Sequence, residues 1–172
     1  MRRRIANIVL MIIFFAIQSC IFPFIPFLAG SPNFMVILVF TYGFIYGERE
    51  GIFYGVFAGI LMDLFYSNAF GIFTLIFIWM GFINGKFSRY FYEDYIILPV
   101  SLCAINEVVY NFVIYVVRFY IRGKTDIFFY VRTIVLPEMI ATMLCTLLLY
   151  RFLLEYNRRW KAIDDKRGKE SA

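Results

Sequence analysis

The chain contains six long apolar runs separated by short polar stretches. Runs of this length and composition are typical of membrane-spanning helices. The pattern predicts an all-α integral membrane protein with about six transmembrane helices. One polytopic membrane domain would cover residues 1–156, and a basic tail would cover residues 157–172. The runs are Ile5–Leu28, Asn33–Tyr46, Gly51–Tyr66, Phe70–Gly85, Tyr95–Ile121 and Phe128–Leu154.

The second, third and fourth runs are short for membrane spans. A run such as Gly51–Tyr66 reaches only about 24 Å as a helix, whereas the hydrocarbon core is about 30 Å thick. These segments need their polar flanks or a thinned bilayer to cross. The alternative is a re-entrant hairpin formed by the second and third runs. It would put Glu48, Arg49 and Glu50 at membrane depth, which is costly, so six spans are favoured.

Basic residues are concentrated on one predicted side of the membrane. Six spans put both termini on the same side, and thirteen of the seventeen lysines and arginines then fall there. Only Arg118, Arg122, Lys124 and Arg132 lie on the other side. The positive-inside rule therefore predicts cytoplasmic N and C termini. A net charge of +5 distributed in this way does not indicate a nucleic-acid partner.

The last run permits two interpretations. Pro137 either kinks one long helix or occupies the first turn of a helix that starts there. In the second case, residues 118–136 include a short external amphipathic stretch at the membrane interface. We favour the second interpretation.

Composition narrows the chemistry that the chain can perform. The apolar fraction of 62% and the charged fraction of 17% exclude a soluble globule of this length. Histidine is absent, which removes histidine-dependent catalysis and histidine zinc sites. Cys20, Cys103 and Cys145 lie far apart in apolar runs, which indicates neither a disulfide framework nor a thiolate site. We expect no catalytic residues, no cofactor and no metal.

Glycines recur every fourth residue through the second and third runs. This spacing gives a smooth helix face that another backbone can approach closely. Close packing within the monomer is the favoured interpretation, and a homodimer formed through this face is the alternative. The glycines assigned to helix packing or to an interface are Gly43, Gly47, Gly51, Gly55, Gly59 and Gly71.

Three acidic residues lie inside apolar runs, where ionisable groups are candidates for function. Asp63 continues the glycine face, and it either accepts hydrogen bonds from a neighbouring helix end or caps the turn that follows it. Glu138 comes directly after Pro137, where a negative charge suits the first turn of a helix and could pair with Arg132. Nothing in the sequence fixes the distances between these residues, so no catalytic pair is predicted.

The third acidic residue, Glu107, lies near the centre of the fifth run. A lone carboxyl group in lipid is either protonated or paired, so we expect its face of the helix to point into the protein. It would form an internal hydrogen-bond network, a contact with a partner helix, or the wall of a ligand cavity. Helical spacing places these polar residues on or beside the same stripe: Cys103, Asn106, Tyr110, Asn111 and Arg118.

Short motifs between residues 31 and 85 occur in a distinctive order. Ser31-Pro32-Asn33 precedes an apolar run, and the glycine repeat leads into Leu61-Met62-Asp63-Leu64, followed by Ser67 and Gly71. This order and spacing resembles the bacterial rod-shape-determining protein MreD family, with Pro32, Asn33, Asp63 and Leu64 as motif residues. The basic first residues, the number of predicted spans, the length and the basic tail extend the resemblance. The fifth and sixth runs match only in hydropathy and length.

The resemblance implies a role in lateral cell-wall elongation at the bacterial inner (cytoplasmic) membrane. MreD-like proteins maintain rod shape and support peptidoglycan synthesis, and they are not known as enzymes. The implied partners are the bitopic membrane protein MreC, the MreB filament, RodA and a penicillin-binding transpeptidase. The implied membrane fold is similar to that of the substrate-binding subunits of energy-coupling-factor vitamin transporters, which is an analogy of fold.

Two functions follow as hypotheses. The leading one is a non-catalytic scaffold of the elongation machinery that binds MreC through apolar helix faces. The alternative is a transporter-like membrane subunit that binds a small solute or lipid in a polar cavity near Glu107, Asn84 and Asn106. A membrane enzyme is disfavoured because the chain lacks histidine and a serine-protease motif.

Overall fold

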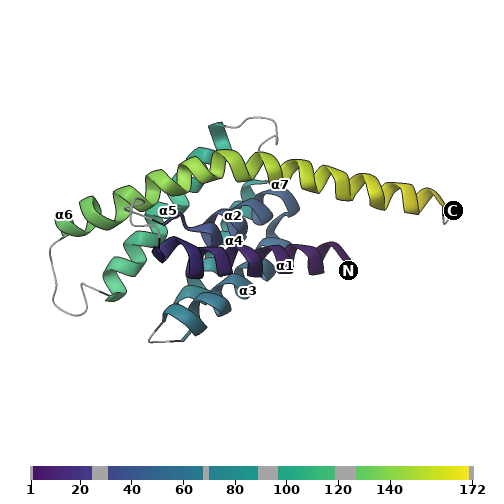
Figure 1. The fold of residues 1–172 in the computed structure, drawn as a ribbon. Helices are drawn as coiled ribbons and strands as arrows, with labels where there is room; N and C mark the ends of the chain where they lie inside the picture. Colours follow the sequence, from purple (N-terminus) through teal and green to yellow (C-terminus); the bar gives the residue numbers. More distant parts are fainter. Residues whose placement is uncertain (1, 25–30, 68–69, 89–96, 119–126, 171–172) are drawn as a thin grey trace.

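The computed structural model describes residues 2–24, 31–67, 70–88, 97–118 and 127–170 (Figure 1). This part of the chain is all-helical and contains no strand, which confirms the all-α prediction. Each of the six apolar runs forms a helix. The helices are α1 (Arg2–Ala16), α2 (Phe34–Tyr46), α3 (Glu48–Tyr66), α4 (Ile72–Phe87), α5 (Ile97–Arg118), α6 (Ile127–Tyr130) and α7 (Leu136–Glu170).

Within the described residues, three helical segments are long and apolar enough to cross a membrane: Arg3–Ile21, Pro99–Val117 and Ile127–Arg159. The first of these extends α1 through a π-helical turn, Ile17–Ile21. The helices α2 and α4 are apolar but shorter. Many large apolar side chains point outward, among them Phe128, Leu148 and Phe65. Such a surface suits contact with lipid or with another apolar helix.

Helix α2 is the centre of the molecule. Every residue from Phe34 to Ile45 is buried, and α1, α3, α4, α5 and α7 all pack against it. A helix that is apolar on all sides, as this one is, has no face suited to water. Its aromatic side chains contact the surrounding helices, as in the stacked rings of Phe40 and Tyr150, whose centroids are 6.2 Å apart.

Helices α3 and α4 pack backbone against backbone. A Cβ atom added at Gly51, Gly55 or Gly59 would collide with the main chain of α4 at Gly81, Phe77 or Thr74 respectively. A Cβ atom added at Gly43 of α2 would lie 2.8 Å from the carbonyl oxygen of Gly81. The glycine face is therefore filled by α4 of the same chain, and a second copy has no access to it.

Two of the predicted packing glycines serve turns instead. Gly47 separates α2 from α3 with a φ of 89°, and Gly71 precedes α4 with a φ of 106°. Nothing in the chain lies within 4 Å of a Cβ added at either position. Because side chains strongly disfavour such φ values, these positions favour glycine for its backbone freedom. Space for a side chain is therefore not what requires glycine at these two positions.

The last apolar run forms one continuous helix. Helix α6 passes through a π-helical turn, Val131–Val135, directly into α7. We favoured a new helix starting at Pro137, and this prediction is wrong because residues 127–136 are already helical and lead directly into α7. The rest of the predicted external stretch, residues 119–126, lies outside the described residues. Proline removes one backbone hydrogen bond and crowds the preceding turn. A π-helical turn immediately before it is the kind of local adjustment that accommodates this defect.

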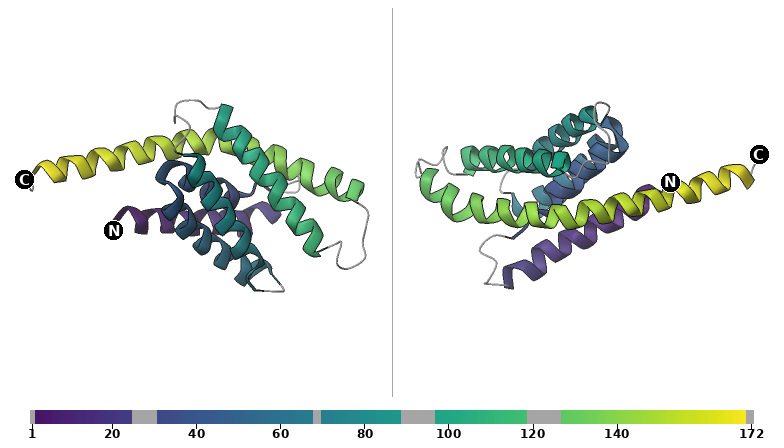
Figure 2. Two further views of the ribbon diagram at one scale, coloured as in Figure 1. Left: turned by 180° about the vertical axis from the view of Figure 1, so that it is seen from behind. Right: turned by 90° about the horizontal axis from the view of Figure 1, so that it is seen from above.

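Helix α7 extends along the whole molecule, and its C-terminal part projects beyond the other helices (Figures 1 and 2). In all three views, the start of α1 and the end of α7 point toward the same end of the molecule. The backbone of the predicted basic tail continues α7 as far as Glu170.

Candidate functional site

A cluster of buried polar side chains lies where the N-terminus of α2 meets the middle of α5 and the first turns of α7. We call this cluster the polar node; its members are Asn33, Glu107, Asn111, Glu138 and Thr142. All but Glu138, which is partly buried, have exposed fractions of 3% or less. A buried polar cluster in a membrane-type fold requires internal partners, and the hydrogen bonds show what they are.

Asn33 fastens the start of α2 to its neighbours. Its Oδ1 accepts a hydrogen bond from the backbone N–H of Val36 at 3.3 Å, and so caps the helix. Its own backbone N–H donates to Oγ1 of Thr142 on α7 at 3.0 Å. The N–H of Phe34 donates to Oε1 of Gln18 at 3.0 Å. Gln18, in the π-helical turn after α1, and the Asn33 side chain thus satisfy N–H groups of the first turn of α2, which explains an Asn at this motif position.

Glu107 and Glu138 bring two carboxyl groups together. The Glu138 carboxyl is a neighbour of Glu107, Asn111 and Asn33. Nδ2 of Asn111 donates to Oε1 of Glu107 at 3.3 Å, whereas Oε2 of Glu107 has no hydrogen-bond donor. The predicted pairing of Glu138 with Arg132 is wrong, because Arg132 is exposed and makes no ion pair with it. Glu138 does lie in the first turn of α7, as predicted. A π-helical turn continues the helix before it, so no free helix end is present there.

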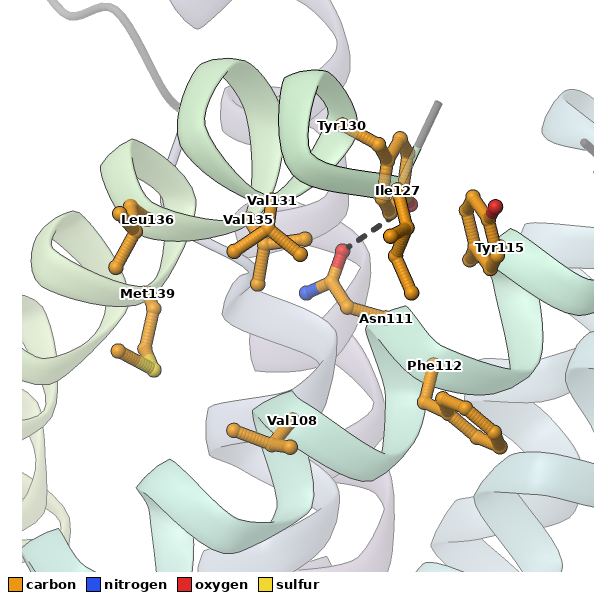
Figure 3. A pocket seen from close by; sticks show the side chains of 10 residues that line it. All are labelled: Val108, Asn111, Phe112, Tyr115, Ile127, Tyr130, Val131, Val135, Leu136 and Met139. Carbon is orange, nitrogen blue, oxygen red and sulfur yellow. Dashed lines mark hydrogen bonds between the residues drawn. The ribbon is translucent and has the colours of Figure 1, made fainter. Parts of the chain in front are cut away.

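The polar stripes of α5 and α7 run antiparallel and meet at several levels. Sγ of Cys103 lies 3.1 Å from Oγ1 of Thr146, which donates to the carbonyl oxygen of Thr142 at 2.7 Å. At the other end, the Tyr130 hydroxyl donates to Oδ1 of Asn111 in a long hydrogen bond of 3.5 Å (Figure 3). The polar stripe on α5 that we predicted to face inward therefore forms an internal hydrogen-bond network. The side chain of Arg118, the last member of that stripe, lies outside the described residues.

Asn84 and Asn106 bind each other across α4 and α5. Each amide donates to the other's Oδ1, at 2.9 and 3.0 Å. Each also donates to the carbonyl oxygen four residues earlier in its own helix, at Met80 and Leu102. These side chains therefore join two helices, and their donors do not face a ligand cavity as the alternative hypothesis expects.

Asp63 caps the start of α4. Its Oδ1 accepts from the backbone N–H of Phe73 at 3.1 Å, and its Oδ2 accepts from the N–H and the hydroxyl of Thr74 at 2.9 and 2.6 Å. The side chain is 3% exposed. It satisfies N–H groups that the first turn of a helix leaves unpaired, and its charge suits the helix dipole. The neighbouring motif residue Leu64 points outward.

The N-terminal end of α1 is bound to the start of α3. Arg4 forms an ion pair with Glu50, in which its Nε donates to both carboxylate oxygens at 3.0 and 3.2 Å. One turn further, Nδ2 of Asn7 donates to the hydroxyl of Tyr54 at 2.9 Å. The turn between α2 and α3 is therefore held at the same end of the molecule as the basic N-terminus.

A pocket of about 240 Å³ lies between α5 and the helix formed by α6 and α7 (Figure 3). Asn111 is its main polar residue, and the walls are apolar. The alternative hypothesis predicts a polar cavity near Glu107, whereas this pocket is apolar and Glu107 is not one of its lining residues. The lining residues are Val108, Asn111, Phe112, Tyr115, Ile127, Tyr130, Val131, Val135, Leu136 and Met139.

The sequence did not reveal that Glu107 and Glu138 meet. A usable signal was present, because Glu138, Thr142 and Thr146 recur every fourth residue in the last run, as Cys103, Glu107 and Asn111 do in the fifth. Two polar stripes of matching period on apolar helices are expected to face each other. Among the described residues, no group of three or more histidine, cysteine, aspartate or glutamate side chains is arranged to hold a metal ion.

Comparison with known proteins identifies the family. The model of the family described as rod shape-determining protein MreD matches residues 2–159, which include α1 to α6 and most of α7. Neither the curated proteins nor the solved structures contain a significant match. Because the family match covers nearly the whole chain, including the fifth and sixth runs, the chain belongs to the MreD family of rod shape-determining proteins.

Proposed function

We propose that the protein is a non-catalytic scaffold of the cell-wall elongation machinery in the bacterial inner membrane, and that it binds MreC. The observation that carries this proposal is the family match over residues 2–159. The polar side chains support it, because Asp63, Asn84 and Asn106 are each used to join helices. A chain whose buried polar groups mostly hold helices together is suited to presenting a fixed surface to partners.

The protein would cross the membrane six times, with both termini in the cytoplasm. The Arg4–Glu50 ion pair supports this topology, because it holds the α2–α3 turn beside the N-terminus. The common direction of the start of α1 and the end of α7 supports it as well (Figure 2). The short helices α2 and α4 are surrounded by other helices or packed against α3, so their lengths need not match the bilayer.

MreC would bind on the outward apolar faces. The glycine face is already filled by α4, so it is not free for a partner. Leu64 on α3, Trp79 on α4 and Ile105 on α5 are 64%, 60% and 59% exposed. Aromatic and aliphatic side chains on rigid helices provide large contact areas at a small entropic cost.

Site-specific photocrosslinking in cells tests the proposal. A photoreactive amino acid is placed at Leu64, Trp79 or Ile105, and at the exposed tail residue Arg159 as a control. We expect adducts with MreC from at least one apolar position and none from Arg159, together with recovery of MreC in a detergent pulldown. Absence of both adducts and co-purification, at normal membrane levels of the chain, would contradict MreC binding.

The pocket beside Asn111 supports a second candidate, a membrane subunit that binds a small ligand. Its apolar walls favour a lipid chain over a polar solute. A thermal-shift screen of the purified chain against lipids, wall precursors and vitamins tests this function. Stabilisation by one ligand, lost when Val135→Trp fills the pocket, would support it. No stabilisation by any ligand would refute it.

A further inference from the structure

Glu107 and Glu138 are a pair of acidic groups that the scaffold function leaves unused. They come from different membrane-type helices, α5 and α7, and their carboxyl groups are neighbours in the interface between these helices. Glu107 is 1% exposed. Neither residue forms an ion pair with a lysine or arginine in the described part of the chain.

One buried acceptor atom of the pair and one buried donor atom beside it form no hydrogen bond. Oε1 of Glu107 accepts from Asn111, but Oε2 accepts from no protein group. Nδ2 of Asn33, on a side chain with no exposed surface, faces Glu138 without forming a hydrogen bond of normal geometry. One oxygen of the pair and one amide nitrogen beside it, Oε2 of Glu107 and Nδ2 of Asn33, are therefore buried without a hydrogen-bond partner.

Among the described residues, the other titratable groups near the pair do not supply a positive charge. On α5, the Cys103 thiol lies one turn from Glu107 and contacts Thr146 of α7. On α6, the Tyr130 hydroxyl donates to Asn111. The start of α2 presents the neutral amide of Asn33. Two carboxylates in this apolar setting repel each other, and neither can donate a hydrogen bond.

We propose that Glu107 and Glu138 form a proton-binding site. One proton is held between Oε2 of Glu107 and the Glu138 carboxyl group, so that one group is a carboxylic acid that donates to the other, a carboxylate. The pair then titrates as a unit. Asn111 supplies an amide donor to the pair, and the unpartnered Nδ2 of Asn33 is available as a second donor. The bound proton joins α5 to α7 beside the start of α2.

Release of this proton has a mechanical consequence. The proton passes to water, the O–H bond of the acid breaks, and the pair changes from one negative charge to two. Repulsion then acts directly between α5 and α7. These helices also carry opposite walls of the pocket, with Val108 on α5 and Met139 on α7 (Figure 3). Proton occupancy therefore controls how closely the two walls approach. The site does not depend on MreC binding.

Infrared spectroscopy of the full chain in lipid nanodiscs tests the proposal. The chain is labelled with ¹³C at the glutamate side-chain carboxyl groups, and the C=O stretch of protonated acids is recorded at neutral pH. We expect an isotope-shifted acid band equivalent to about one glutamate per chain, because exposed glutamates are ionised at this pH. Absence of such a band would overturn the proposal without the use of any variant.

Variants assign the band to this pair. Glu107→Gln/Glu138→Gln is expected to abolish the band, because the amides replace both the acid and its acceptor. Glu155→Gln, at an exposed position on the same helix as Glu138, is the matched control and should retain the band. A band unchanged in the folded double variant would place the proton elsewhere and overturn the proposal.

A sodium ion is the competing occupant of a carboxyl pair. Spectra are therefore compared in sodium chloride and in choline chloride at equal ionic strength and pH. We expect the acid band to be the same in both salts. Loss of the band in sodium alone would show that the site binds a metal cation in place of the proton, and it would overturn the assignment.

Discussion

Single polar residues in this protein act mainly as connections between helix ends. Asp63 and Asn33 each satisfy the first N–H groups of a helix, α4 and α2 respectively, and each is almost fully buried. In a membrane, water is not present to take over such bonds, so an unpaired N–H group is costly. This explains why both motif residues carry oxygen acceptors on short side chains.

Removal of the Asp63 carboxylate should destabilise the fold. Asp63→Ala leaves two backbone N–H groups and the Thr74 hydroxyl without their acceptor, and we expect a loss of about 2 kcal/mol in the free energy of unfolding. Asp63→Asn keeps one acceptor oxygen and should show a smaller loss. Thermal or denaturant unfolding in detergent measures both against Glu155→Gln. Equal stability of Asp63→Ala and the control would contradict the capping role.

At the scale of elements, the arrangement of α2, α3 and α4 depends on which helix packs against the glycine face. The face of α3 is in backbone contact with α4, and Gly43 of α2 approaches the same part of α4. Glycines have no side chain to hold these helices apart, so their backbones are already in contact and an added atom would collide with the facing main chain. The turns at Gly47 and Gly71 then set the directions in which α3 and α4 begin.

Enlargement of a packing glycine should therefore prevent folding, whether or not a partner is present. Gly55→Leu adds a side chain where even a Cβ atom would collide with the backbone of Phe77, and Gly55→Ala should already cost about 1–3 kcal/mol. Ile60→Leu, at an outward position on the same helix, is the matched control. Accumulation in the membrane and thermal stability in detergent measure the effect. A normally folded Gly55→Leu protein that fails only in self-association would contradict the intramolecular packing.

At the scale of the whole molecule, the short helix α2 is tolerated because it lies inside the bundle. It is surrounded by five other helices, so its ends meet protein before they meet lipid. The outward apolar surface is shared by the long segments of α1, α5 and α6–α7 and by the outer faces of α3 and α4. The position of the charged turn between α2 and α3 distinguishes the two possible topologies: six spans put it in the cytoplasm, and a re-entrant hairpin puts it at membrane depth.

Cysteine accessibility distinguishes six spans from a re-entrant hairpin. In a chain whose native cysteines are replaced by serine or alanine, Arg49→Cys should react with a polar maleimide only from the cytoplasmic side, because six spans put this turn in the cytoplasm. Arg159→Cys is the cytoplasmic control and Ser67→Cys the external one. The readout is labelling in intact cells against labelling in inverted vesicles. Protection of Arg49→Cys from both sides would favour the hairpin.

The local elements of this protein could be predicted well from the sequence, and their contacts could not. Each apolar run became a helix because the backbone of an apolar segment has few other ways to satisfy its hydrogen bonds. The interpretation of the last run failed at Pro137, since the sequence alone does not show that a π-helical turn absorbs the defect. The glycine period identified Gly51, Gly55 and Gly59 as suited to close approach, and packing within the monomer was the favoured interpretation, but the period did not show that α4 is the partner helix.

The sequence by itself determined the helical class, the family and the few residues that break the apolar pattern, because periodicity and composition are local properties of the chain. Only the tertiary structure decided what those residues contact. It brought Glu107 to Glu138 across separate helices, directed Asp63 to the start of α4, and turned the Asn84 and Asn106 amides toward each other. The physical reason is that a polar group buried among apolar helices must find its partner in space, and the sequence does not encode that distance directly.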